Sequence, residues 1–193
     1  MPRIVEFKEE EVLRSAMVVF WEKGYSGTSM QDLVDATGLN RSSLYNSFGS
    51  KLALYQETLR RYAKETGTVF QKALLKAQNP LEAVQFIFEG FLPEILDKAR
   101  GKGCFAPNCK AEMANQEDNI KQWLLRMQED SLNLFTDLIA EGQKQGLFNK
   151  DQGARDYAYY VFSAFQGFRM TGILVKDETI LLNIIASTIQ VLK

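Results

Sequence analysis

Apolar side chains recur with the period of an α-helix along most of this chain. Near the N-terminus, positions i, i+3, i+4 and i+7 of one helical face are occupied by Leu13, Ala16, Met17 and Phe20. Comparable stripes follow as far as the C-terminus. No segment alternates apolar and polar residues with the period of two that marks a half-buried strand. The sequence therefore predicts an all-α fold.

The composition narrows the chemistry available to the chain. Its 193 residues include no histidine and two cysteines, which leaves no Ser-His-Asp or Cys-His pair for catalysis and no His-ligated or four-thiolate metal site. We therefore expect no enzymatic activity, no metal and no cofactor. Because the net charge is −1, any binding to nucleic acid must depend on a local basic patch.

No apolar run approaches the roughly 18 residues that a membrane-spanning helix needs. The longest run, from Ala16 to Trp21, ends after six residues. Charged residues follow Met1 closely where a signal peptide would have an apolar region. We therefore expect a cytoplasmic protein with no membrane partner.

Two short helices joined by a four-residue turn are predicted in residues 28–48. Thr28 or Ser29 can cap the first helix, and Thr28 and Gln31 have the spacing of a capping box. In the turn, Gly38 tolerates a positive φ, and Asn40 can cap the second helix. This arrangement is a helix-turn-helix, in which the second helix can enter the major groove of DNA while the first crosses the backbone.

The second of these helices, at about residues 41–47, carries mainly polar side chains, while Leu44 and Phe48 can anchor its inner face. Residues 36–64 hold five basic side chains and one acidic side chain, a local net charge of +4. Side chains suited to contact base edges or phosphates are Thr28, Ser29, Arg41, Ser42, Ser43, Tyr45, Asn46 and Lys51. An ordinary helical hairpin with a solvated basic face is the alternative interpretation.

Four segments together resemble the DNA-binding signature of TetR-family transcriptional regulators. They are Gly24-Tyr25, Thr28-Ser29-Met30-Gln31-Asp32-Leu33-Val34, Thr37-Gly38-Leu39 and Leu44-Tyr45-Asn46-Ser47-Phe48-Gly49-Ser50-Lys51. The resemblance covers roughly residues 8 to 55 in order and spacing. The chain departs from many members of the family at Ser42, where they have glycine, and at Ser47, where they have histidine.

The resemblance implies a homodimer of all-helical subunits with a division of labour along the chain. Residues 1–50 would form a three-helix DNA-binding domain, and residues 51–193 a helical domain for ligand binding and dimerisation. Side chains in or beside the major groove would be Arg41, Ser42, Ser43, Tyr45 and Asn46. Phosphates would be held by Thr28, Ser29 and Lys51.

The larger domain is rich in large apolar side chains that can form either a core or a ligand pocket. Candidate pocket residues are Tyr62, Phe88, Phe105, Trp123, Met127, Phe162, Gln166 and Arg169. Gln166 and Arg169 interrupt a stripe of phenylalanines and are suited to an oxygen or carboxylate of a ligand. The alternative is that they are exposed or form pairs across the dimer.

Cys104 and Cys109 flank a break rich in glycine and proline, with basic residues nearby. Cations and a helix N-terminus lower the pKa of a thiol, so Cys104 is a candidate redox residue. A Gly-Cys pair at this place also resembles a branch of the family in which some members sense electrophiles or oxidants. The alternative is that both side chains are small buried hydrophobic groups.

These observations predict a sequence-specific DNA-binding transcriptional regulator. We expect a homodimeric repressor that binds a double-stranded DNA operator and is released by a small-molecule inducer. One alternative is a DNA-bound thiol sensor of oxidants or electrophiles that acts through Cys104. Another, of a different class, is an all-α protein that binds a small molecule and no DNA.

Overall fold

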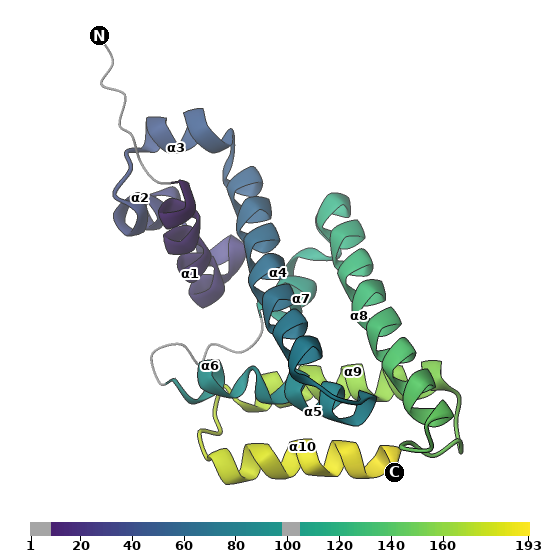
Figure 1. The fold of residues 1–193 in the computed structure, drawn as a ribbon. Coiled ribbons are helices and arrows are strands. Elements are labelled where there is room, and N and C mark those ends of the chain that lie inside the picture. The colour runs from purple at the N-terminus through teal and green to yellow at the C-terminus, as the bar shows by residue number, and fades with distance from the viewer. Residues whose placement is uncertain (1–8, 98–104) are drawn as a thin grey trace. The chain divides into compact units, whose positions relative to one another are not determined.

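The computed structural model describes residues 9–97 and 105–193. Within these residues it contains α-helices and no strand, which confirms the predicted all-α fold (Figure 1). The helices are α1 (Glu9–Gly27), α2 (Met30–Thr37), α3 (Arg41–Phe48), α4 (Lys51–Lys76), α5 (Pro80–Glu89), α6 (Leu92–Leu96), α7 (Phe105–Met113), α8 (Asp118–Lys144), α9 (Ala154–Thr171) and α10 (Glu178–Leu192).

The chain forms two compact units. The first comprises Met1–Glu65 together with Phe105–Lys121, and the second comprises Thr66–Cys104 together with Gln122–Lys193. The first unit therefore extends beyond residue 50 and includes α7, which lies far along the sequence. The division of function between residues 1–50 and residues 51–193 stays a prediction.

The first unit begins with α1, whose regular helix is interrupted at Gly24 by a φ of 72°. Ser29 then caps α2: its hydroxyl accepts the N–H of Asp32, and the Asp32 side chain accepts the N–H of Ser29. The capping box is therefore formed by Ser29 and Asp32, and the predicted pairing of Thr28 with Gln31 is wrong. The physical reason is that the Thr28 hydroxyl donates instead to the carbonyl of Gly24, at 2.6 Å.

The turn between α2 and α3 has the predicted chemistry. Gly38 adopts a φ of 70°, and Asn40 caps α3 by accepting the N–H of Ser43 at 2.8 Å. Leu33 and Leu44 are buried, so α2 and α3 each direct an apolar side chain into the unit. The helix-turn-helix therefore packs against a small hydrophobic core through these side chains, and most of its polar side chains lie at the surface.

The second unit is built around a cluster of aromatic rings. The ring centre of Phe165, on α9, lies between 5.2 and 6.4 Å from those of Phe70, Phe88, Phe91 and Phe135. These five side chains come from α4, α5, the junction before α6, α8 and α9. They are joined by buried residues of α10, so the unit has one continuous core.

None of the helices in the described part of the chain is long and apolar enough to cross a lipid bilayer.

Candidate nucleic-acid interface

The outward face of α3 carries a set of hydrogen-bonding side chains. Leu44 is buried and fixes the inner face of this eight-residue helix. This short helix makes only about two turns. The buried Leu44 side chain and the Asn40 cap therefore hold its outward-facing residues in place. The exposed residues on this helix are Arg41, Ser42, Tyr45, Asn46 and Ser47.

Arg41 and Tyr45 are neighbours on this outward face. The guanidinium carbon of Arg41 lies 5.9 Å from the centre of the Tyr45 ring, and this contact leaves the guanidinium at the surface. Ser43 is half-buried, and its N–H is held by Asn40. Arginine can pair with the edge of guanine and asparagine with that of adenine, so the exposed face of α3 has the chemistry to read bases.

The three residues predicted to bind phosphate differ in how exposed they are and in which groups they contact. Thr28 is 1% exposed and its hydroxyl donates to the carbonyl of Gly24, and phosphate binding by this side chain stays a prediction. Ser29 lies at the surface, where its hydroxyl serves the capping box. Lys51 opens α4, and its ammonium lies 4.4 Å from the centre of the Tyr25 ring.

Asp32 and Lys23 belong to this region and were not singled out by the sequence. The ammonium of Lys23 donates to Asp32 Oδ1 at 2.5 Å, while Asp32 Oδ2 accepts the N–H and the hydroxyl of Ser29. The hydrogen bonds from Lys23 and then Ser29 hold the pKa of Asp32 well below its usual range. The acidic residue in the first turn of α2 is therefore ionised, and Lys23 offsets its charge.

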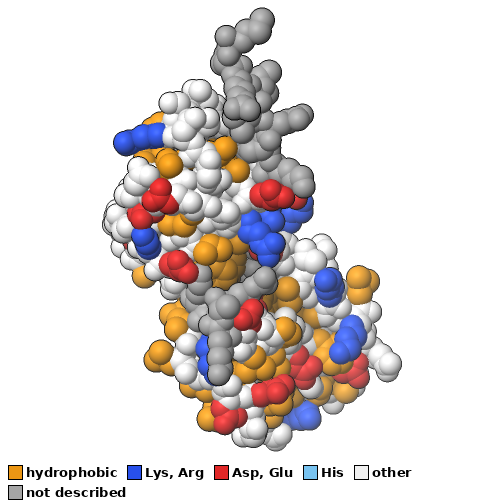
Figure 2. All heavy atoms as spheres, turned by 90° about the vertical axis from the view of Figure 1, so that its left-hand side faces the viewer, with side chains coloured by type: hydrophobic (Ala, Val, Ile, Leu, Met, Phe, Trp, Pro, Cys, Tyr) orange, Lys and Arg blue, Asp and Glu red, His pale blue; other side chains and the backbone are white. Residues whose placement is uncertain are grey.

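On the face drawn in Figure 2, Lys and Arg side chains lie singly or in small groups between acidic and hydrophobic side chains. No single basic surface covers that face. This distribution fits the net charge of −1 and leaves only local groups of basic side chains on this face.

The predicted ligand-pocket residues belong to both units. Tyr62 and Phe105 are in the first unit, where both rings pack against Trp21. The second unit contains Phe88, Trp123, Met127, Phe162, Gln166 and Arg169. Phe88 is part of the core, whereas Trp123, Met127, Phe162 and Gln166 are half-buried.

Arg169 is buried on α9 and forms an ion pair within the chain. Its Nη2 donates to Glu94 Oε1 on α6 at 2.8 Å, and its guanidinium carbon lies 4.1 Å from the centre of the Phe91 ring. Arg169 therefore pairs with a carboxylate of its own chain, an arrangement that the sequence did not distinguish from ligand binding.

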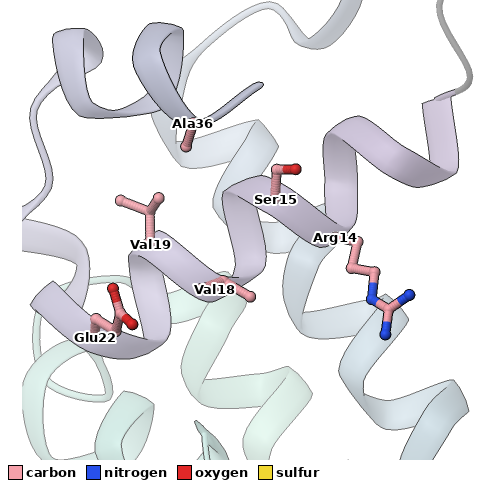
Figure 3. Close-up of a pocket in the computed structure, with 6 residues that line it drawn as sticks. All are labelled: Arg14, Ser15, Val18, Val19, Glu22 and Ala36. Atoms are coloured by element: carbon pink, nitrogen blue, oxygen red, sulfur yellow. The ribbon is translucent and has the colours of Figure 1, made fainter. Parts of the chain in front are cut away.

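Two surface hollows lie elsewhere. One, of about 470 Å³, is lined by five residues of α1 and one of α2 (Figure 3): Arg14, Ser15, Val18, Val19, Glu22 and Ala36. The other, of about 370 Å³, lies between α4 and α5 and is lined by Val69, Lys72, Ala73, Lys76, Phe86, Glu89 and Gly90. Neither hollow is lined by a predicted pocket residue, so the ligand pocket stays a prediction.

Of the two cysteines, only Cys109 lies in the described part of the chain. Cys104 lies outside the described residues. Cys109 is a free, buried thiol on α7, and its burial raises its pKa to about 11, although a hydrogen bond with Tyr55 acts in the opposite direction. At neutral pH it is protonated, which is the form that reacts slowly. In the part of the chain that the structure describes, no group of three His, Cys, Asp or Glu residues is placed to hold a metal ion.

The sequence matches known regulators over most of its length. Residues 12–58 match the bacterial regulatory proteins of the tetR family, and residues 80–187 match the tetracyclin repressor-like C-terminal domain. The chain is 29% identical to the HTH-type transcriptional repressor DhaR of Mycobacterium sp. (strain GP1), over 82% of this chain and 78% of DhaR. It is also 29% identical to the uncharacterized HTH-type transcriptional regulator YezE of Bacillus subtilis, over 77% of both chains.

Solved structures share the fold at low sequence identity. The TetR-family regulator CifR, in a cysteine mutant complexed with a 26-base-pair operator, superposes with a TM-score of 0.85 at 23% identity and 98% coverage of both chains. The reduced form of NemR from E. coli gives 0.81 at 15% identity, covering 95% of this chain and 96% of NemR. The matches to both parts of the chain, with the helix-turn-helix that carries an exposed polar face, decide against a protein that binds only a small molecule: the chain belongs to the TetR family and is a DNA-binding transcriptional regulator.

Proposed function

We propose that the exposed face of α3 enters the major groove and that Arg41, Ser42, Tyr45 and Asn46 contact base edges there. The observation that carries this proposal is the division of α3 into a buried anchor, Leu44, and an exposed hydrogen-bonding face. Ser43 lies at the margin of that face, because it is half-buried. Base readout from a short helix needs this combination of a fixed backbone and free polar side chains.

Phosphates are held on both sides of α3 by Lys51 and by the start of α2, which Ser29 caps. The first N–H groups of a helix have no partner within it, and they attract an anion. Lys51 supplies a positive charge at the start of α4, directly after α3. These contacts orient the protein on DNA without reading its sequence.

The experiment is a selection from a library of random duplexes at low salt, followed by sequencing of the bound pool. Enrichment of an inverted repeat with half-sites one helical turn apart, or a multiple of one turn, supports the proposal, since a dimer presents two copies of α3. Binding without any enriched sequence contradicts base readout by α3.

The exposed faces of α9 and α10 support a homodimer. Large apolar side chains exposed there or just after α9 are Tyr159, Tyr160, Met170, Leu174, Ile180, Leu182 and Val191. Clusters of this kind on a soluble protein mark interaction sites, and two copies of one surface form a closed pair. Two helices from each subunit would make a four-helix interface.

The dimer is tested by the mass of the protein in sedimentation experiments. The double variant Met170→Glu, Val191→Glu adds charge to the exposed face and is expected to sediment as a monomer. Leu75→Glu is the matched control, because Leu75 is 87% exposed on α4 and outside the proposed interface. A wild-type monomer, or a double variant that remains dimeric, contradicts the proposed interface.

Repression with release by a small-molecule inducer is the regulatory mode that fits the relatives, several of which are repressors by name, including DhaR and ComR of Escherichia coli. α4 contributes residues to both units, so a ligand bound by the second unit can act on the helix that begins at Lys51. An inducer that binds more tightly to a conformation that does not fit the operator raises the fraction of protein in that conformation, and the protein leaves the DNA.

This mode is tested by the distance between labels on the two α3 helices of a dimer. A compound found by thermal shift is expected to weaken operator binding and to change that distance. Weaker binding at an unchanged distance contradicts the proposal. The thiol alternative is tested in the same assay: if Cys104→Ser responds to an electrophile as the wild type does, Cys104 is not the sensor.

A further inference from the structure

Helix α7 packs on α1, although the two helices lie far apart in the sequence. It belongs to the first unit. Four of its residues share one face, at positions i, i+4, i+7 and i+8: Phe105, Cys109, Glu112 and Met113. Three of them are buried, and Glu112 is the charged member of the stripe.

Phe105 fixes the start of α7. Its ring stacks on Trp21 of α1, with the ring centres 5.8 Å apart, and meets the edges of Tyr55 and Tyr62 of α4 at 5.7 Å. The interlocked rings leave α7 little freedom to slide along α1 or α4. The position of Glu112, two turns further along, is therefore set relative to the end of α1.

The Glu112 carboxylate binds the backbone at the corner between α1 and α2. Its Oε2 accepts the N–H of Tyr25 at 2.8 Å, and its Oε1 accepts the N–H of Ser26 at 2.6 Å. Gly24 makes room for this contact, because a Cβ at that position would lie 2.8 Å from Oε2. Two successive N–H groups beside a residue with positive φ form a concave site for an anion, and Glu112 fills it.

Glu112 is charged when it makes this contact. Partial burial acts to raise its pKa, but the hydrogen bonds from Ser26 and Tyr25 and the charge of Lys51 outweigh it, and the pKa lies below its ordinary value. Hydrogen bonds from backbone N–H groups to a carboxylate are roughly twice as strong as those between neutral groups. The corner is thus held by a pair of strong contacts from outside the helix-turn-helix.

The corner that Glu112 holds positions groups on the proposed DNA surface. The Tyr25 ring lies under the ammonium of Lys51, and the Gly24 carbonyl accepts the hydroxyl of Thr28. Ser29, the cap of α2, is the next residue. A shift of the Tyr25 backbone would therefore be felt at both proposed phosphate contacts.

We propose that Glu112 is a positioning residue for operator recognition: its carboxylate fixes the corner between α1 and α2, and with it the relative placement of Lys51, the start of α2 and α3. This role rests on the proposed function of α3. It assigns to α7, outside the helix-turn-helix, a direct part in the geometry of the DNA-binding surface.

The test compares Glu112→Gln and Glu112→Ala with Glu10→Gln, which removes the same charge from an exposed position on α1. Affinity is measured for the selected operator and for a scrambled duplex of equal length. We expect Glu112→Gln to lower operator affinity about tenfold and Glu112→Ala to lower it further, with affinity for the scrambled duplex changed less than twofold. Glu10→Gln should match the wild type for both duplexes.

A spectroscopic readout reports on the contact itself. The ¹H–¹⁵N signals of Tyr25 and Ser26 are expected to move upfield in both Glu112 variants, because an N–H loses a charged acceptor. If those signals move and operator affinity does not, Glu112 only stabilises the fold and the proposal is overturned. An equal loss of affinity for both duplexes overturns it as well, since a general loss of binding is not a loss of positioning.

Wild-type protein supplies a test that does not depend on a variant that folds. If the corner is coupled to operator binding, the operator must in turn stabilise the corner, and amide exchange at Tyr25 and Ser26 should slow by at least tenfold on addition of the operator. Exchange that slows no more than with the scrambled duplex overturns the proposal. If the wild type selects no operator at all, it is the proposed function of α3 that has failed.

Discussion

The ammonium of Lys51 lies 4.4 Å from the centre of the Tyr25 ring. This contact joins the first residue of α4 to the segment that follows Gly24 in α1. A cation over an aromatic face is held in place while its hydrogens stay available to an anion. The ring of Tyr25 therefore acts as a platform that presents the Lys51 charge next to α3.

Lys51→Ala is expected to weaken binding to all duplexes by a similar factor. Because one phosphate contact is lost, the slope of log K against log salt should become shallower by about 1. Binding isotherms at several salt concentrations measure both quantities. Lys72→Ala is the control, because Lys72 is exposed in the second unit. An unchanged affinity and slope for Lys51→Ala would show that Lys51 contacts no phosphate.

Gly24→Ala is expected to destabilise the protein by about 1–3 kcal/mol. Gly24 has a φ of 72° and a ψ of 174°, a conformation that glycine adopts and other residues avoid. The added Cβ would also lie 2.8 Å from Glu112 Oε2. Urea unfolding measures the change, and Gly27→Ala, where a Cβ meets nothing closer than 3.7 Å, should lose nothing. Equal stability of the two variants would contradict this account of the corner.

The ion pair between Arg169 and Glu94 should matter more than the one between Arg155 and Glu129. Arg169 is 1% exposed, whereas both members of the second pair are open to solvent. Glu94→Ala removes the carboxylate that pairs with the buried Arg169 and is expected to lower the free energy of unfolding by about 3–5 kcal/mol. Glu129→Ala is expected to lower it by about 0–1 kcal/mol. If chemical denaturation gives similar losses of stability for the two variants, burial of Arg169 does not make its ion pair more important for stability.

Cys109 is expected to resist alkylation in the folded protein. With its pKa raised from 9.0 to about 11, its thiolate is roughly 100-fold scarcer at neutral pH than that of an ordinary cysteine, and the side chain is also buried. Because the unfolded chain ionises at a lower pH, this thiol stabilises the folded state less as pH rises from about 9 to 11. Peptide mapping after brief iodoacetamide treatment, with and without urea, measures the protection. Equal labelling in both states would refute it.

The sequence predicted the parts of the fold that depend on local chemistry. The cap at Asn40, the positive φ of Gly38 and the buried position of Leu44 all follow from residue types at close spacing, and all are confirmed. The sequence left open whether Thr28 or Ser29 caps α2, and the pairing of Thr28 with Gln31 is wrong. Thr28 and Ser29 are chemically alike, and the choice between them depends on Gly24, whose carbonyl takes the Thr28 hydroxyl.

Contacts between distant parts of the chain could not be predicted from the sequence. Glu112 binds backbone groups 86 and 87 residues away, and Arg169 pairs with a carboxylate 75 residues away. No pattern in a single sequence marks such partners, because any of the acidic residues could serve. The proposed base-reading residues were predicted only in part. The sequence pattern indicates the helix that carries them, but only the fold shows that Ser43 is half-buried while Asn46 is exposed.

Repeating the duplex selection with Arg41→Ala beside the wild type tests directly whether the outward face of α3 reads base sequence. We expect both proteins to enrich an inverted repeat of the same spacing. The variant should lose base preference at one position in each half-site, at a cost of about 1–3 kcal/mol for the wild-type operator. An identical enriched sequence bound with identical affinity would contradict the claim that Arg41 and its helix read the operator.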